Sequence, residues 1–434
     1  MPLGLLYVMA NTPARHEKHF LDLCFEPDAN AALALAVRAN TPELIAISMR
    51  NIQNNDYTGL SDNLDYYASL VETCKRNSRA TVVLGGAGFS VMPRDLMVRL
   101  QADFGIAGEG EKAFPKLLDA LELGSGMSTV PALYRMEEDR ETVRANASPD
   151  FLDMTTLDVP ERSVIDPRYF SEYGIDSIQT KRGCPLRCDY CTYPIIEGRK
   201  GRLRTAESVV DEMFASASAN PNIRHFFIVD SVFNLPKTHA KNVCRELIAR
   251  NWTIPWSCYA NPLGFDQEFA DLAVAAGCAG MEVGSDSGVD EVLARLHKGF
   301  TVDHIRNMHE ICRSSGVRDC HTFILGTQGE TLADARRTLD FLANLDPFAA
   351  IIMLWTDDYE SLHPELRNQR LALRGQIEQL LVEMAPAHPT WSMPGLGINF
   401  SEDLFAKLRK AGMHGPLWQH VRGPLRPERT RSTA

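Results

Sequence analysis

Short apolar runs and amphipathic segments alternate along most of this chain of 434 residues. In residues 1–140, three apolar runs are typical of buried parallel strands. They cover residues 44–48, 81–84 and 104–107, and a shorter run at 20–25 fits a fourth strand. Helical spacing lies between the runs. This alternation predicts an α/β domain with an open, doubly wound, Rossmann-like sheet.

A second and longer alternation follows a stretch rich in Asp, Pro and Thr, and we interpret residues 141–175 as a linker. Six further strands are predicted, at residues 177–180, 225–229, 256–259, 280–284, 321–325 and 350–354. A helical pattern follows each of the first five, which predicts a (βα)6 partial TIM barrel over residues 176–385 with its functional residues at the carboxyl ends of the strands. Residues 386–434 are expected to form a C-terminal extension, with an amphipathic helix at 401–411 and a basic tail that holds Arg422, Arg426, Arg429 and Arg431.

Charge, hydropathy and cysteine usage disfavour three classes of protein: nucleic-acid-binding, membrane-spanning and disulfide-rich secreted proteins. The formal net charge of −11 disfavours nucleic acid as a partner, because nucleic-acid binding needs a basic surface. No apolar stretch approaches the length of a membrane span. Most of the ten cysteines are scattered singly, unlike the disulfide framework of a short secreted chain. We therefore expect a reducing, cytoplasmic location.

Three cysteines are clustered: Cys184, Cys188 and Cys191 share one short loop after the first predicted barrel strand. Thiolate is the form of cysteine that ligates iron, and neighbouring cations, among them Lys181 and Arg182, favour it. Three ligands on a four-iron cluster leave one iron open for a reactive partner. The spacing alone also allows a zinc knuckle that takes its fourth ligand from elsewhere in the chain.

The run from Gln179 to Pro185, with its Cys-x₃-Cys-x₂-Cys spacing, resembles the signature of the radical SAM superfamily, and the resemblance extends over about residues 177–386. It implies that the three cysteines hold a [4Fe-4S] cluster, that the open iron binds S-adenosylmethionine (SAM), and that reductive cleavage yields a 5′-deoxyadenosyl radical. It also implies SAM contacts at the later strand ends. The residues that match those positions are Tyr190, Asp230, Ser231, Glu282, Ser285, Asp286 and Gly326. Tyr190 also fits an ordinary core tyrosine, and Glu330 fits either the Gly326 turn or a plain first-turn helix residue.

The N-terminal domain resembles the cobalamin-binding class of this superfamily at three strand ends. The resemblance implies that these edges hold cobalamin, through Ser48, Arg50, Asn51, Gly85, Gly86, Gly88, Phe89 and Glu109. The Asp-x-His-x-x-Gly motif of other cobalamin proteins is absent, so histidine ligation of cobalt is not expected. A relic domain that only packs or recruits a partner is the alternative. In this class a strand precedes the Pro-Leu-Gly-Leu helix, which here begins at Pro2. We expect either a native start further upstream or an incomplete domain, and we favour the former.

The resemblance implies a cobalamin-dependent methyltransferase that acts on an unactivated carbon of a small-molecule, lipid or peptide substrate. Its electrons would come from a donor such as flavodoxin or ferredoxin. The alternatives are a radical enzyme that performs rearrangement, cyclisation or oxidation without methyl transfer, and a non-catalytic Fe–S/cobalamin-binding protein. Candidate pocket residues near strand ends, each of which fits packing equally well, are Tyr193, Asn261, Trp355, Asp357 and Tyr359.

Overall fold

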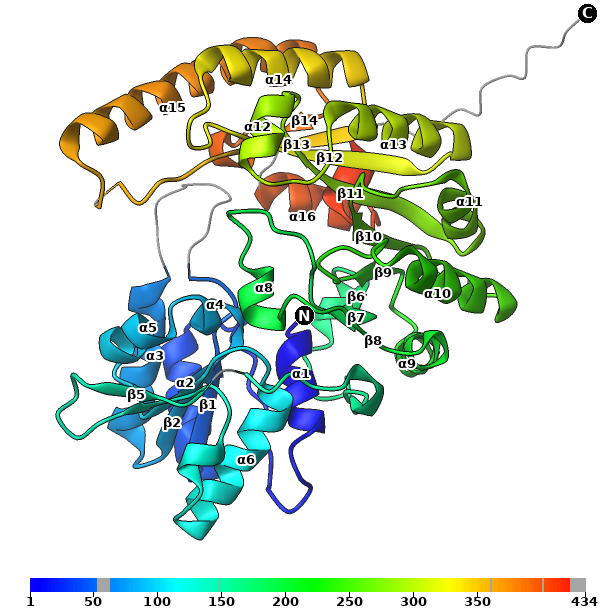
Figure 1. Cartoon of the computed structure of the whole chain (residues 1–434). Coiled ribbons are helices and arrows are strands. Elements are labelled where there is room, and N and C mark those ends of the chain that lie inside the picture. Colours follow the sequence, from blue (N-terminus) through cyan, green and yellow to red (C-terminus); the bar gives the residue numbers. More distant parts are fainter. Residues whose placement is uncertain (53–62, 148, 360, 400–401, 422–434) are drawn as a thin grey trace, which may run out of the picture. The chain divides into compact units, whose positions relative to one another are not determined.

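The computed structural model describes residues 1–52, 63–147, 149–359, 361–399 and 402–421. It divides into two compact units (Figure 1). Unit 1 comprises Met1–Ser171, Asp176–Asn222 and Val229–Ser231, and unit 2 comprises Glu172–Ile175, Ile223–Ile228 and Val232–Ala434. The segment with the three clustered cysteines therefore groups with the N-terminal domain, whereas the sequence placed a boundary at 140. The predicted basic tail, from Arg422 onward, lies outside the described residues.

Unit 1 is built on a five-stranded sheet in the order β1-β2-β3-β4-β5. Its strands are β1 (Leu44–Ser48), β2 (Thr81–Gly85), β3 (Phe104–Ile106), β4 (Leu133–Met136) and β5 (Val143–Ala145). The first three are parallel and match the three predicted runs. The last two add an antiparallel hairpin, of which only β5 lies in the predicted linker. The strand predicted at 20–25 is wrong. The side chain of Asp22 accepts a hydrogen bond from the Cys24 amide there, and such a local turn competes with extended pairing.

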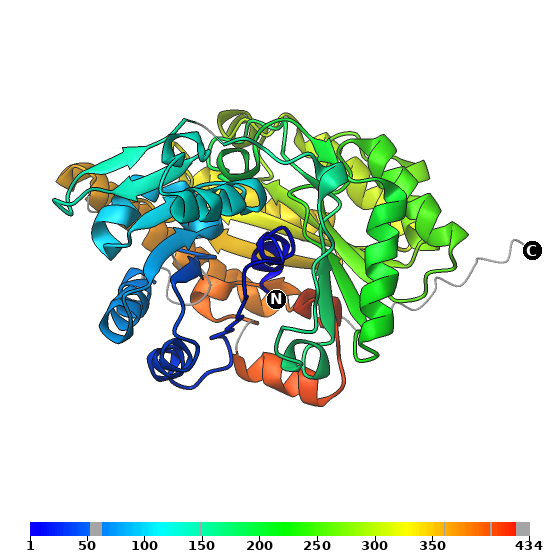
Figure 2. The same ribbon diagram turned by 90° about the horizontal axis from the view of Figure 1, so that it is seen from below.

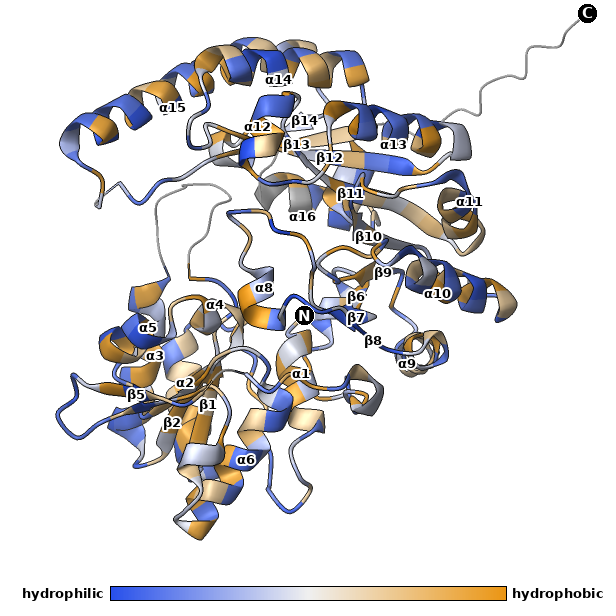
Figure 3. Cartoon of the chain, in the orientation of Figure 1, coloured by the Kyte–Doolittle hydropathy of each residue, from blue (hydrophilic) through white to orange (hydrophobic). Residues whose placement is uncertain are grey.

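Helices cover both faces of this sheet, as expected for a doubly wound fold. One apolar cluster joins α2 (Ala29–Asn40), α3 (Leu64–Asn77) and α5 (Pro93–Leu100) to one face, where Val82 and Leu84 of β2 point. A second cluster joins α6 (Gly110–Leu123) to the other face through Val83. The period-2 alternation of β2 thus supplies two cores. The strands β1 and β2 are correspondingly apolar in Figure 3.

The second sheet has seven strands in the order β14-β13-β12-β11-β10-β9-β6. They are β6 (Ile175–Ile178), β9 (His225–Ile228), β10 (Trp256–Ala260), β11 (Cys278–Asp286), β12 (Arg318–Leu325), β13 (Ala349–Leu354) and β14 (Trp391–Ser392). Sequential order with parallel registers from β9 to β14 confirms the predicted partial-barrel pattern. The two-residue β14 was not predicted. β6 ends earlier than expected, because the amides of Thr180 and Lys181 donate to Asp230 instead of continuing the strand.

Helices of unit 2 line one face of this sheet (Figure 2). They are α10 (Lys237–Ala249), α11 (Gln267–Ala275), α12 (Asp290–Arg295), α13 (Val302–Ser315), α14 (Leu332–Leu345) and α15 (Pro364–Met384). Ile305, Met308 and Cys312 of α13 are buried together, as their spacing predicts. Among the described residues, none of the helices has both the length and the apolar character that crossing a bilayer requires.

The C-terminal segment packs on the strands of unit 2. It consists of α16 (Glu402–Lys410) and a 3₁₀ turn at Leu417–His420. The indole N–H of Trp418 donates to Glu282 of β11 at 2.7 Å, and Gln419 donates to Ser257 of β10 at 2.6 Å. A Cβ at Gly280 would lie 2.4 Å from the Trp418 ring, so only glycine admits this contact. The carboxyl of Glu282 is consequently buried, and that burial raises its pKa from 4.5 to about 7.

The raised pKa of Glu282 predicts a specific pH dependence of stability. A carboxyl whose folded pKa exceeds its unfolded value binds more protons in the folded state, so its contribution to stability is lost as the pH rises from 4.5 to about 7. Glu282→Gln keeps an acceptor for Trp418 and removes the ionisation. In thermal unfolding, the free energy of unfolding of the variant relative to that of the native protein should rise by about 3 kcal/mol between pH 5 and 8. Parallel profiles for the two proteins would contradict this account.

Candidate functional site

The cysteine loop begins at a tight turn in unit 1. Lys181–Arg182 (β7) pairs antiparallel with Arg202–Leu203 (β8), and the chain then turns at Gly183. Gly183 has a φ of +88°, and a Cβ there would lie 2.2 Å from the carbonyl oxygen of Lys200, so both the conformation and the space require glycine. The amide of Cys184 donates to Gly198 at 3.1 Å, which closes the loop.

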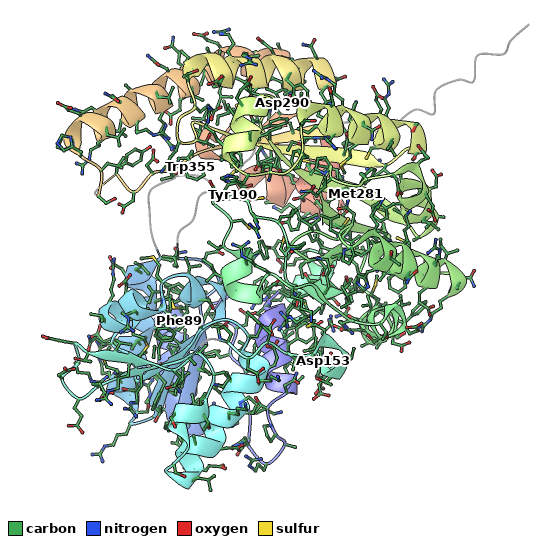
Figure 4. All side chains as sticks on the ribbon, viewed as in Figure 1. Phe89, Asp153, Tyr190, Met281, Asp290 and Trp355 are labelled. Carbon is green, nitrogen blue, oxygen red and sulfur yellow. The ribbon has the colours of Figure 1, made fainter. Side chains whose placement is uncertain are left out.

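The three clustered cysteines lie on this one loop, and none of them forms a disulfide. Cys184 is buried, whereas Cys188 and Cys191 are half-buried, and the amide of Cys191 donates to the carbonyl of Cys188. Tyr190, beside Cys191, is also half-buried (Figure 4). Cys244 lies in apolar surroundings elsewhere in the chain, where burial raises the pKa of its thiol and so disfavours the thiolate that ligates iron. The clustered set is therefore the one suited to an iron–sulfur centre.

A buried polar network supports the loop from behind. The carboxylate of Glu197 accepts from the amide of Gly183 at 3.2 Å and from the side chain of Gln179 at 3.0 Å. The other end of Gln179 accepts from Arg182 at 2.9 Å. Burial raises the pKa of Glu197. The turn before Cys184 is thus held by side chains on both sides, and none of these supporting residues was predicted from the sequence.

Asp230 lies where β9 ends, but its contacts differ from those expected. One carboxylate oxygen accepts from the amide of Thr180 at 2.7 Å, and the other accepts from its hydroxyl at 2.5 Å. Both oxygens thus bind the segment that leads into the cysteine loop and position it, and the contact of Asp230 with the SAM amine stays a prediction.

Ser231 keeps the place predicted for it. Its hydroxyl oxygen is shielded from solvent and has no hydrogen-bond partner among the described residues. Such an orphaned polar group is costly unless a ligand or water satisfies it. Together with three cysteines on one loop that form no disulfide, this hydroxyl fits the binding of a group that the chain itself does not supply.

The predicted residues of β11 point in different directions. Glu282 binds Trp418, as described above. Ser285 shares a hydrogen bond of 2.7 Å with His321 of β12 and is fully buried. Asp286, with a φ of +61°, forms a buried ion pair of 2.7 Å with Lys298. Each side chain has a partner within unit 2, because a bulge at residues 284–286 interrupts the alternation that the sequence implied.

The Gly326 turn is built as expected and closed by Glu330. Gly326 has a φ of +83°, and its amide and that of Thr327 both donate to one carboxylate oxygen of Glu330, at 2.9 and 2.8 Å. Burial raises the pKa of Glu330, and its second oxygen has no partner among the described residues. Glu330 therefore stabilises the Gly326 turn by accepting two of its amide hydrogen bonds, and it is not only a first-turn helix residue.

The residues predicted to hold cobalamin fall into three groups. Ser48, Arg50 and Asn51 are exposed where β1 ends and remain available to a ligand. The glycines after β2 serve packing, since a Cβ at Gly86 would lie 2.5 Å from the carbonyl oxygen of Met49; Gly85 and Gly88 likewise lie against neighbouring backbone. Phe89 (labelled in Figure 4) is fully buried inside unit 1, with its ring against Gly105, and its contact with cobalamin stays a prediction.

Glu109, the last of the residues predicted to hold cobalamin, forms contacts within unit 1. Its carboxylate pairs with Arg202 at 2.5 Å and accepts from the Leu152 amide at 2.8 Å. Glu111, which was not predicted, pairs with Arg182 at 2.6 Å. The Gly-Glu-Gly-Glu stretch after β3 thus binds Arg182 of β7 and Arg202 of β8, which flank the cysteine loop. In the sequence, only the presence of two acids near one strand end and of two arginines near the cysteines could have indicated these ion pairs.

Several of the predicted pocket residues form hydrogen bonds or ion pairs with neighbouring parts of the chain. The side chain of Asn261 accepts from the Leu263 amide at 2.8 Å. Asp357 accepts from the Trp355 indole at 3.0 Å and from Arg370 of α15 at 2.7 Å. Trp355 and Tyr359 line one cavity together with Gly326. Tyr193, on α8 (Tyr193–Glu197), is partly exposed directly after the cysteine loop.

Two family models match the chain. Residues 178–342 match the radical SAM superfamily, and residues 1–118 match the B12-binding domain. Among curated proteins, tryptophan 2-C-methyltransferase from Streptomyces laurentii is 29% identical over 396 residues, covering 76% of this chain and 65% of that protein. The anaerobic magnesium-protoporphyrin IX monomethyl ester cyclase of Synechocystis is 24% identical, covering 80% of this chain and 68% of that protein.

A solved structure extends the likeness to nearly the whole chain. The radical SAM methyltransferase TsrM from Kitasatospora setae, solved with cobalamin and a [4Fe-4S] cluster bound, superposes with a TM-score of 0.84 and 25% identity. The match covers 97% of this chain and 94% of that one. With its Cys-x₃-Cys-x₂-Cys loop, its parallel barrel sheet and both domain matches, this chain belongs to the radical SAM superfamily, in the class that carries an N-terminal B12-binding domain.

Proposed function

We propose that the chain is a cobalamin-dependent radical SAM methyltransferase that acts on a carbon atom of a small molecule. One observation carries the proposal: a single compact unit contains both a B12-binding-type sheet and a loop with three cysteines that form no disulfide. The match of nearly the full chain to a cobalamin- and cluster-bound methyltransferase supports it.

The chain's own residues would hold and shield the reacting groups. When bound, a [4Fe-4S] cluster would supply the electron that cleaves SAM, and cobalamin would carry the methyl group. Cys184, Cys188 and Cys191 would ligate iron, and the orphaned hydroxyl of Ser231 is available to hydrogen-bond a ligand beside them. The exposed Ser48, Arg50 and Asn51 would border cobalamin. We expect a one-electron donor such as flavodoxin or ferredoxin, in the reducing cytoplasm.

The substrate class follows from the relatives. Two of them are named for methyl transfer to tryptophan and to a cytidylyl-phosphonate, which are small molecules. Tryptophan is therefore the first substrate to test.

Cyclisation is the second candidate, because a relative named as a cyclase matches 80% of this chain. The two reactions differ in their use of SAM. Methyl transfer converts SAM to S-adenosylhomocysteine, whereas radical rearrangement or cyclisation needs only the cleavage that gives 5′-deoxyadenosine.

Replacing a cluster ligand should remove iron without unfolding the protein. Cys184→Ala, Cys188→Ala and Cys191→Ala should each lose the iron–sulfur absorbance and most of the iron after anaerobic reconstitution, since a thiolate is removed from a three-ligand site. Cys24→Ala, which removes an exposed cysteine distant in sequence, is the matched control and should keep both. Normal iron content and absorbance in any of the three variants would exclude that cysteine as a ligand.

Products should distinguish methyl transfer from the alternatives. Anaerobic incubation of the cobalamin- and cluster-loaded protein with SAM, reductant and tryptophan should give S-adenosylhomocysteine and a product heavier by one CH₂, measured by mass spectrometry. Protein lacking cobalamin should give neither. Formation of 5′-deoxyadenosine without S-adenosylhomocysteine, across a panel of indoles and other small aromatics, would instead support rearrangement or cyclisation.

A further inference from the structure

The turn at Gly326 and Thr327 is fixed from two sides. Glu330 accepts hydrogen bonds from both amides of this turn. The carbonyl oxygens of the same two residues accept from Arg370 of α15, Thr327 at 3.2 Å and Gly326 through the other terminal nitrogen. One carboxylate and one guanidinium thus satisfy the amides and the carbonyls of the turn, which would otherwise need water or other partners.

Arg370 is itself oriented by Asp357. Its Nε donates to one carboxylate oxygen of Asp357 at 2.7 Å, and the other oxygen accepts from the indole of Trp355 (labelled in Figure 4) at 3.0 Å. The side chains of Arg370 and Asp357 are only 12% and 5% exposed. A planar guanidinium can direct donors to a carboxylate and to two carbonyls at once, whereas a lysine ammonium has no such fixed fork. The site therefore requires arginine.

The helix that carries Arg370 is an addition to the common part of the barrel. The match to the radical SAM family model ends at residue 342, and α15 begins at Pro364. Ile377 of the same helix also approaches the turn, since a Cβ at Gly326 would lie 3.4 Å from its Cδ1 atom. A turn inside the matched region is therefore held by side chains from outside it.

We propose that Arg370 is a positioning residue for SAM, which fixes the Gly326 turn in the conformation that receives the adenosine part of SAM. This rests on the proposed function. The amine and carboxylate of the methionine part are the groups that can chelate iron, so the adenosine part remains for a turn on another strand. Gly326 has a left-handed φ of +83°. Without Arg370, SAM binding would have to order this turn, and the entropy lost would weaken the affinity.

SAM binding to the cluster-loaded protein, measured by equilibrium dialysis, tests this role. Arg370→Met removes the donors and keeps an unbranched side chain. It should weaken SAM binding about tenfold, roughly the cost of ordering one backbone residue. Competition against labelled SAM should show the same loss for 5′-deoxyadenosine and native affinity for methionine. Iron content and iron–sulfur absorbance should be native, because the cysteine loop is untouched.

Two further variants make the test specific. Arg374→Met, one turn further along α15, removes an arginine that pairs with Glu378 at 2.9 Å and donates to the carbonyl of Trp355, and it should keep native SAM affinity. Arg370→Lys keeps a charge opposite Asp357 and should lose nearly as much affinity as Arg370→Met, because an ammonium cannot serve both carbonyls.

The outcomes separate this role from a general loss of structure. Native SAM affinity in Arg370→Met, or in Arg370→Lys where Arg370→Met does not fold, would overturn the proposal. Equal losses for methionine and 5′-deoxyadenosine, or an equal loss in Arg374→Met, would overturn it as well. A cluster-loaded native protein that binds no SAM would refute the proposed function together with this role. Absence of methyl transfer alone would refute only the methyltransferase assignment, since none of these measurements uses it.

Discussion

Two buried ion pairs join the N-terminal sheet to the loop that carries the cysteines. Glu109 and Glu111 follow β3, the last parallel strand of that sheet, and they bind Arg202 and Arg182 on the two strands that flank the loop. Tyr7 of α1 (Leu3–Ala10) makes a further connection, since its hydroxyl donates to Glu212 of α9 (Ala206–Ala219). Glu212 in turn pairs with Arg204 at 2.6 Å, directly after β8. The edge of the B12-binding-type domain and the cysteine loop are thereby parts of one compact unit.

Such pairs contribute more to geometry than to stability. The cost of removing two charges from water nearly cancels their attraction, so apolar residues would stabilise the interface equally well. A bidentate guanidinium–carboxylate contact, however, fixes distance and orientation in a way that apolar packing does not. A reaction that uses two cofactors requires that accuracy, because small displacements of reacting atoms reduce rates strongly. We infer that these ion pairs serve alignment of the cysteine loop.

The sequence predicted the strands better than the directions of their side chains. Apolar runs located β1 to β3 and β9 to β13, because buried parallel strands read as continuous apolar segments. The hairpin β4–β5 and the two-residue β14 were missed, since strands so short carry little pattern. At the strand ends, spacing indicated that Asp230, Glu109 and Phe89 lie near a ligand edge. It did not reveal that these three side chains contact other parts of the chain: Asp230 contacts Thr180, Glu109 contacts Arg202, and Phe89 packs against Gly105.

Lys181 and Arg182 show why sequence proximity to a motif is insufficient to assign a role. Both are cationic, both precede Cys184, and both are buried, so the sequence treats them alike. Their surroundings differ because consecutive residues of a strand point to opposite sides. Arg182 pairs with Glu111, which follows β3, whereas Lys181 has only a longer-range attraction to Glu197. A charge that is neutralised within the chain, such as Arg182, serves to fix the structure. The buried hydroxyl of Ser231, which has no partner among the described residues, is therefore a more specific guide to a bound group than the cations near the motif.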